Sequence, residues 1–110
     1  MVIHIDARKL TDSAGLHAVL GEAFGFTPGY GKNLDALVDC LTHLDDPTAT
    51  MSRVQVLPGQ LVLLVIDHAQ GLTLHTAQQL KLLIDVTAFV NWRRLAKKQL
   101  PILAIAYDAA

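Results

Sequence analysis

The segment that decides the fold reads Tyr30-Gly-Lys-Asn-Leu-Asp-Ala-Leu-Val-Asp-Cys-Leu-Thr42. Asn33 is a favourable residue for capping a helix. Leucines follow it at three- and four-residue intervals, which is typical of an amphipathic helix with one face in a core; they are Leu34, Leu37, Leu41 and Leu44. We therefore expect a short helix from about Leu34 to Leu44.

Two carboxylates lie on another face of this helix. Asp35 and Asp39 are one turn apart, and no Lys or Arg follows Lys32 within the helix. Like charges at this spacing destabilise an isolated helix by roughly 0.2–0.5 kcal/mol, and only Asp35 is near enough to the N-terminus to gain from the helix dipole. Presenting negative charge to a partner would account for Asp39. Gly31 predicts a backbone bend that brings Tyr30 beside this face.

The segment is similar, nearly letter for letter, to the central motif of the barstar family, intracellular protein inhibitors of small secreted ribonucleases of the barnase type. The resemblance implies that this helix and the loop before it plug the active site of a basic ribonuclease. By position, Asp39 would be the main mimic of an RNA phosphate and Asp35 its neighbour. The surrounding contact surface implied by the motif consists of Tyr30, Gly31, Asn33, Val38 and Thr42.

The chain departs from the barstar pattern around this motif. Barstar carries a second tyrosine directly before the residue matched by Tyr30, where this chain has Gly29, and its tryptophan between the two aspartates is Val38 here. Its acidic contact on the last helix falls near Arg94, which would reverse the charge. The segment from Asp45 to Gln60 is extra, at the place where barstar turns quickly into its second strand. The resemblance thus implies a retained centre of the binding surface and an altered rim.

Length and composition are those of a single domain spanning residues 1–110. A chain of this length with 52% apolar residues buries roughly 65% of its unfolded surface, enough for a core without disulfides or metal. The N-terminal residues show no basic leader followed by a long apolar run, and no segment approaches the ~18 apolar residues of a membrane span. Together with a single cysteine, these features predict a cytoplasmic location.

The net charge of −1 conceals two clusters of opposite sign. The acidic cluster is Asp35, Asp39, Asp45 and Asp46, and the basic cluster is Arg93, Arg94, Lys97 and Lys98. We expect a dipolar molecule. An acidic face disfavours direct nucleic-acid binding there, because that binding neutralises phosphate charge, and it favours a basic protein partner.

Apolar runs predict an α/β fold with three strands. They are Val2 to Asp6, Leu61 to Ile66 and Ile102 to Tyr107, and a further helix capped by Ser13 reaches Phe24. The continuous apolar run of the middle strand predicts that it is buried on both faces of the sheet. Because helices separate the strands along the chain, we expect a parallel, barstar-like sheet.

The helical region from Thr73 to Lys98 does not have one apolar side. Up to Ile84 the apolar residues share one face, but from Val86 onward the apolar side turns by about a third of a turn, through Phe89, Val90 and Trp92. A break near Asp85 would explain this shift and would give about four helices in all. Alternatively, a straight helix would meet another chain with its second apolar side.

Plainer interpretations of the acidic segment stay open. Asp35 and Asp39 could form an ordinary solvated helix face, because aspartates are common on surfaces. Tyr30 could pack beneath its loop rather than stack on a partner. Cys40 is more typical of a buried apolar position than of a nucleophile paired with His43, because a thiolate there would face like charge.

The resemblance to the barstar family implies a non-enzymatic immunity protein that binds and neutralises a ribonuclease. The five histidines lack metal-ligand spacing and no catalytic or phosphate-binding motif is present, so we expect no metal and no cofactor. Two alternatives stay open. One is a barstar-fold interaction module whose partner is not a ribonuclease. The other is an enzyme that uses the acidic face with Asp67 and His68, which follow the middle strand where α/β folds place ligands. A monomer is the simpler expectation for the oligomeric state.

Overall fold

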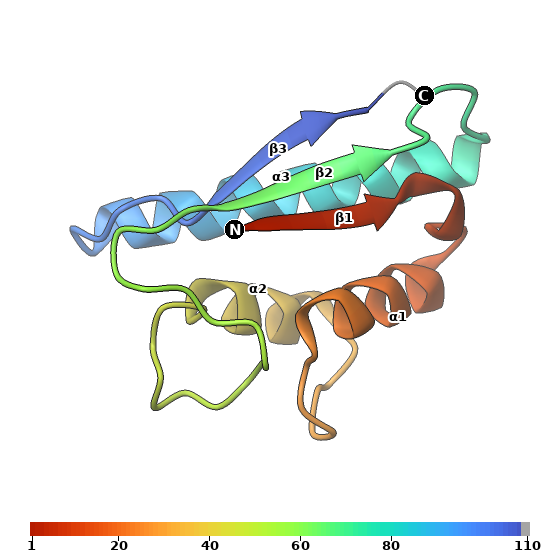
Figure 1. Cartoon of the computed structure of the whole chain (residues 1–110). Coiled ribbons are helices and arrows are strands. Elements are labelled where there is room, and N and C mark those ends of the chain that lie inside the picture. Colours follow the sequence, from red (N-terminus) through yellow and green to blue (C-terminus); the bar gives the residue numbers. More distant parts are fainter. Residues whose placement is uncertain (109–110) are drawn as a thin grey trace.

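The computed structural model describes residues 1–108 and contains one sheet with helices along the chain between its strands (Figure 1). In chain order the elements are β1 (Val2–Asp6), the short 3-10 helix η1 (Ala7–Lys9), α1 (Ser13–Phe24), α2 (Leu34–Thr42), β2 (Val62–Asp67), α3 (Leu74–Ala96) and β3 (Leu103–Tyr107). The three strands are parallel, and β2 lies between β1 and β3. The predicted three-stranded parallel sheet is confirmed.

Capping residues set where the helices begin. The Asn33 side chain accepts a hydrogen bond from the Ala36 amide at 2.8 Å, so it caps α2 as its position predicts. Thr73 caps α3 in the same way. At α1 the cap is Asp12, which accepts from the Gly15 amide at 2.7 Å, and not Ser13.

The predicted break near Asp85 is wrong. The helix α3 is continuous over 23 residues, so residues 1–108 contain three α-helices rather than about four. One buried stripe with spacings of three and four residues runs along the whole of α3 and consists of Thr76, Leu80, Leu83, Thr87, Val90 and Arg94, with Val86 beside it. Phe89 and Trp92 are 47% and 63% exposed. The apparent rotation of the apolar side therefore comes from two surface aromatic residues, and not from a second core-facing side.

Only one face of the sheet is buried. Along β2 the residues Val62, Leu64 and Ile66 are buried, whereas Leu63 and Val65 are only partly covered. In Figure 1 α1 and α2 lie below the sheet and α3 lies behind it. The prediction that the middle strand is buried on both faces is thus wrong, since the continuous apolar run conceals an alternation between a core face and an open face.

The extra segment after α2 forms no helix or strand but packs back on the loop that follows α1. The Arg53 amide donates to the Gly25 carbonyl at 2.9 Å, and the Thr27 amide donates to the Met51 carbonyl at 3.1 Å. Val56 anchors the segment in the core at 6% exposure. The segment therefore braces the loop that leads to α2.

Candidate functional site

The acidic face of α2 is exposed while its opposite face is part of the core. Leu37 and Leu41 are fully buried, which fixes the rotation of the helix. Asp35 then points to solvent, and within residues 1–108 its carboxylate has no hydrogen bond or ion pair. This free carboxylate lies in the first turn of α2, where the helix dipole favours negative charge.

Asp39 is exposed as well, but it has one intramolecular neighbour. Its Oδ1 lies 3.7 Å from Nη1 of Arg93, which reaches across from α3, and the Asp39 side chain remains 54% exposed. A single contact of this length between partly exposed groups contributes little to stability. The Asp39 carboxylate therefore remains available to a stronger cationic partner.

Tyr30 packs beneath its loop, which is one of the two possibilities left open by the sequence. Its ring centroid lies 4.6 Å from that of Phe26, and its hydroxyl is hydrogen-bonded to Nδ1 of His17. Burial raises the pKa of the Tyr30 phenol to about 12 and lowers the pKa of His17. Near neutral pH the phenol is therefore uncharged. The Tyr30 ring is held in place by its packing on Phe26 and its hydrogen bond to His17.

Tyr30 and Asp39 line one shallow hollow of about 230 Å³ between the loop and α2, together with Thr27, Gly29, Gly31, Ala36, Cys40 and Met51. The expectation that Tyr30 lies beside the acidic face is confirmed. The left-handed residue of the bend, however, is Lys32 with φ 54°, and not Gly31. Gly31 matters for close approach instead, because a Cβ there would lie 3.2 Å from Nδ2 of Asn33.

Two residues expected on the contact surface lie beneath it. Val38 is 7% exposed and belongs to the core cluster, and Thr42 is 6% exposed. The Thr42 hydroxyl donates to the Val38 carbonyl at 2.6 Å. Neither side chain is exposed in the free protein, because Val38 packs in the core cluster and the Thr42 hydroxyl is hydrogen-bonded within the helix. Both residues support the acidic face from below.

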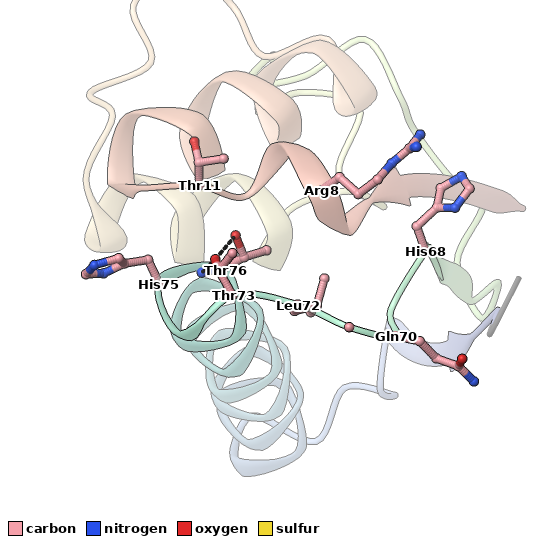
Figure 2. A pocket seen from close by; sticks show the side chains of 9 residues that line it. Arg8, Thr11, His68, Gln70, Leu72, Thr73, His75 and Thr76 are labelled. Atoms are coloured by element: carbon pink, nitrogen blue, oxygen red, sulfur yellow. Dashed lines mark hydrogen bonds between the residues drawn. The ribbon is translucent and has the colours of Figure 1, made fainter.

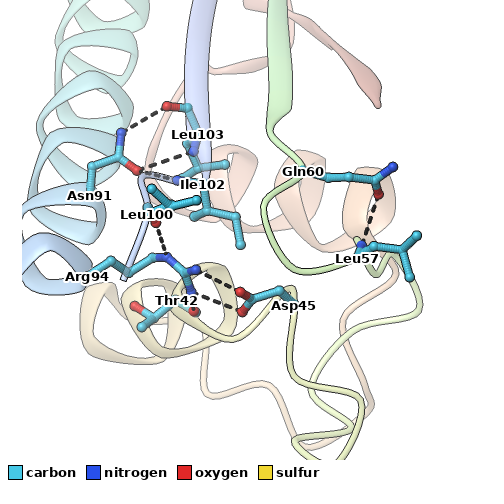
Figure 3. Close-up of polar contacts among 9 residues, drawn as sticks. All are labelled: Thr42, Asp45, Leu57, Gln60, Asn91, Arg94, Leu100, Ile102 and Leu103. Carbon is cyan, nitrogen blue, oxygen red and sulfur yellow. Dashed lines mark hydrogen bonds and ion pairs between the residues drawn. The ribbon is translucent and has the colours of Figure 1, made fainter. Parts of the chain in front are cut away.

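Arg94 is the residue whose role the sequence interpretation missed (Figure 3). It is 4% exposed, and its guanidinium makes two hydrogen bonds to the Asp45 carboxylate, at 2.7 and 3.0 Å. It also donates to the backbone carbonyls of Thr42 and Leu100, each at 2.8 Å. Arg94 thus ties the C-terminal end of α2 to α3 and to the chain before β3, and it is not a rim residue of reversed charge.

The spacing of apolar residues along α3 could have predicted that Arg94 is buried. Arg94 lies four residues after the buried Val90, on the helix face that packs against the core. Its partner Asp45 has a lowered pKa because the Arg94 guanidinium hydrogen-bonds to the carboxylate. Asp46 also has a lowered pKa, because its carboxylate accepts from the Thr48 side chain and amide.

The two charge clusters therefore meet instead of forming opposite poles. Arg93 and Arg94 each contact an aspartate of the acidic cluster, so the dipolar arrangement expected from the sequence is wrong in this part. Of the four acidic residues, Asp45 and Asp46 are used within the fold. The carboxylates left to a partner are those of Asp35 and Asp39.

A second hollow lies at the other end of the molecule, at the carboxyl ends of β1 and β2 (Figure 2). It measures about 560 Å³, and its lining includes Arg8, His68 and the first turn of α3. Asp67 does not join His68 there, because its carboxylate is bonded to the His4 ring at 2.9 Å. Since α3 rises about 1.5 Å per residue, this hollow lies roughly 30 Å from Arg93, so His68 and the acidic face of α2 do not form one site.

Cys40 and His43 do not form a nucleophile and base pair in the described chain. Cys40 is buried, and burial raises the pKa of its thiol. Nδ1 of His43 lies 2.7 Å from the backbone carbonyl of Asp39, to which it donates. Among residues 1–108 no three His, Cys, Asp or Glu side chains are grouped so that they could hold a metal ion. No helix of the described part is long and apolar enough to cross a membrane.

Comparison with known proteins gives one match that covers nearly the whole chain. A family model described as "Barstar (barnase inhibitor)" matches residues 1–103. The matched range includes β1, β2 and all three α-helices, and it ends at Leu103, the first residue of β3. No curated protein matches the chain significantly.

Proposed function

The chain belongs to the barstar family, and from this premise we propose that it is an intracellular inhibitor of a small barnase-type ribonuclease. The family is one of barnase inhibitors, so a barnase-inhibitor-like role follows from membership. In our proposal α2 and the loop before it cover the nuclease active site. The protein acts by binding and is not an enzyme.

The observation that carries this proposal is the availability of Asp35 and Asp39. Their neighbours in the acidic cluster are used within the fold, whereas these two carboxylates face solvent on a rigid helix. Their Cβ atoms lie about 5–6 Å apart, as one helical turn dictates. Nuclease Arg, Lys and His side chains that normally bind RNA phosphates would form charge-assisted hydrogen bonds with them.

The remaining contact surface is formed by the exposed loop and the start of α2. Gly31 and Asn33 are exposed, and Tyr30 lines the hollow beside Asp39. Val38 and Thr42 hold the helix in place beneath these residues. Because α2 is capped by Asn33 and tied down by Arg94, little ordering accompanies binding, which favours high affinity.

The negative charge of this surface also predicts how fast the protein associates with the nuclease. Opposite charges steer association, so binding should be fast and should slow with added salt.

A cell that makes a toxic ribonuclease needs such an immunity protein in its cytoplasm to neutralise the toxin before export. The partner is a basic protein, and neither nucleic acid nor a membrane is bound directly.

The proposal is tested by measuring RNA cleavage by a barnase-type ribonuclease while the protein is titrated in. We expect inhibition that is complete near one molecule per nuclease and that weakens with salt. Asp39→Ala should weaken inhibition strongly and Asp35→Ala less so. Glu22→Ala is the matched control, because it removes the same charge from an exposed position on α1. Full cleavage in the presence of excess wild-type protein would contradict the proposal.

A second candidate function is an interaction module whose partner is not a ribonuclease. The observation that favours it is Arg93, which places a positive charge 3.7 Å from Asp39 on the surface that would meet a basic nuclease. Affinity capture from cell extract would separate the two candidates. Recovery of a partner without ribonuclease activity, competed by excess protein but not by the Asp39→Ala variant, would favour the interaction module.

A further inference from the structure

The helix α3 carries two large aromatic side chains on its exposed face. The rings of Phe89 and Trp92 lie 5.9 Å apart between centroids with an interplanar angle of 24°, so they stack on each other in solvent. Adjoining exposed aromatic rings form a contiguous apolar surface, and contiguous apolar surfaces of sufficient size mark interaction sites. Trp is also the residue type most enriched where binding energy concentrates.

Arg93 joins this aromatic pair to the acidic helix. Its guanidinium carbon lies 6.0 Å from the centre of the Phe89 ring, at the outer range of a cation–π contact, and its Nη1 lies 3.7 Å from Oδ1 of Asp39. One guanidinium group therefore spans the distance between Asp39 on α2 and Phe89 on α3. The aromatic pair and the acidic face form one continuous surface.

The acidic loop and helix α2 are small compared with a standard protein interface. Between Thr27 and Leu44 only nine residues are exposed. A stable protein interface of standard size uses about 20–30 residues on each side. The loop and α2 alone therefore fall short of an interface of standard size, and the exposed aromatic residues of α3 adjoin them through Arg93.

We propose that Phe89 and Trp92 are the second contact region of the binding surface and that they dock on the base-stacking surface of the ribonuclease. This inference rests on the proposed function. A nuclease that cleaves RNA must bind phosphates with cations and must also hold unstacked bases against flat apolar or aromatic groups. Asp35 and Asp39 match the first requirement, and the flat rings of Phe89 and Trp92 match the second.

The test uses the fact that Trp92 is the only tryptophan of the chain. Protein labelled with 5-fluorotryptophan gives one ¹⁹F resonance, which reports on Trp92 in the wild-type sequence and is not obscured by nuclease tryptophans. Titration with an inactive barnase-type ribonuclease should shift this resonance and protect it from solvent. The double variant Phe89→Ala with Trp92→Ala should bind at least tenfold more weakly by calorimetry.

The control is Leu74→Ala, because Leu74 is 71% exposed at the opposite end of the same helix. Its affinity should stay within twofold of wild type. If wild-type protein binds the nuclease but neither the ¹⁹F resonance nor the affinity of the double variant changes, the aromatic contact is wrong and the proposed function stands. If wild-type protein does not bind at all, both are wrong.

A second copy of the chain is the competing occupant of the aromatic pair. Sedimentation of the wild-type protein and of the double variant decides between them. We expect both to be monomeric at micromolar concentration. A wild-type dimer that the double variant dissociates would overturn the proposal, because the pair would then be covered before the nuclease arrives.

Discussion

Arg93 and Arg94 are neighbours on α3, and each contacts an aspartate on α2 or just after it. The two ion pairs differ in burial, in distance and in the number of hydrogen bonds. Arg94 is 4% exposed and holds Asp45 with two short hydrogen bonds while serving two backbone carbonyls. Arg93 is partly exposed and approaches Asp39 to only 3.7 Å through one atom pair. The first pair is part of the fold, whereas the second leaves its carboxylate available.

The difference shows why charge counted along the sequence misleads about function. Asp39 and Asp45 have the same chemistry and lie six residues apart, but only the burial and the number of partners of each tell which one can bind a foreign cation. A carboxylate already held by a buried guanidinium would lose those bonds in binding anything else. An exposed one gives up only a weak, water-screened contact.

The largest effect that distinguishes the two arginines should be on folding. Arg94→Met removes the donor for the Asp45 carboxylate and for the carbonyls of Thr42 and Leu100, and loss of one partner of a buried pair costs roughly 3–5 kcal/mol. Arg93→Met should change the free energy of unfolding by less than about 1 kcal/mol. Urea unfolding of both variants measures this. Equal losses of unfolding free energy in the two variants would contradict the claim that only Arg94 is part of the fold.

Acid should weaken the Arg94 pair next. The pKa of Asp45 is lower in the folded than in the unfolded chain, so its stabilisation is complete above the unfolded value of 3.8 and is lost as the pH falls below it. Asp6, whose pKa is lowered to about 2 by its hydrogen bond to Arg8, is present in wild type and in Asp45→Asn alike, so its own loss of stabilisation in acid cancels when the two proteins are compared. We therefore expect the difference in unfolding free energy between wild type and Asp45→Asn to shrink below about pH 4.

That difference is measured by urea unfolding of both proteins between pH 2.5 and 7, a range chosen to be about one unit or more on each side of the unfolded pKa. A constant difference across the range would mean that the Asp45 carboxylate is not the group that Arg94 stabilises.

A smaller effect should appear in the association rate of the Arg93 variant. Arg93 repels a basic nuclease at the place where Asp39 attracts it, so Arg93→Ala should speed association by roughly two- to fivefold at low salt, because rim charges act chiefly on this rate. Stopped-flow mixing with a barnase-type ribonuclease at two salt concentrations measures it. Slower association at low salt would show that Arg93 itself contacts the partner.

The smallest effect should be on the stability of the Asp39 variant. Asp39→Ala removes one weak contact with Arg93 and also the repulsion from Asp35, two terms of about 0.2–1 kcal/mol and 0.2–0.5 kcal/mol with opposite sign. The free energy of unfolding should therefore stay within about 0.5 kcal/mol of wild type. A loss of several kcal/mol in urea unfolding would place Asp39 in the fold rather than on the binding surface.

Local patterns predicted most of the fold because they depend on neighbours in sequence. Strand β1 spans the expected residues, helix α1 ends at Phe24 as expected, Asn33 caps α2, and the strands pair in parallel. What the patterns missed depends on contacts far apart in the chain. The sequence alone predicts a rotation of the apolar side of α3, because exposed aromatic residues cannot be told from core residues by their type.

The candidate site shows the same limit. The motif identified Asp35 and Asp39, and the structure places both on one exposed face. It could not show that Val38 lies in the core, because its exposure depends on how α2 rotates against the sheet. Nor could it show that Arg94 reaches Asp45, 49 residues away along the chain. Long-range pairing of this kind leaves no local pattern.

The central claim, that Asp39 serves binding while Asp45 serves folding, is tested most directly by one paired measurement. Asp39→Ala and Asp45→Ala are each titrated calorimetrically into a barnase-type ribonuclease and unfolded in urea. We predict that Asp39→Ala loses roughly 2–5 kcal/mol of binding and almost no stability, a range taken from charge pairs in protein interfaces, the barnase–barstar complex among them, and not from this structure. Asp45→Ala should lose stability and keep its affinity while folded. Unchanged affinity of Asp39→Ala for a nuclease that binds the wild type would contradict the claim.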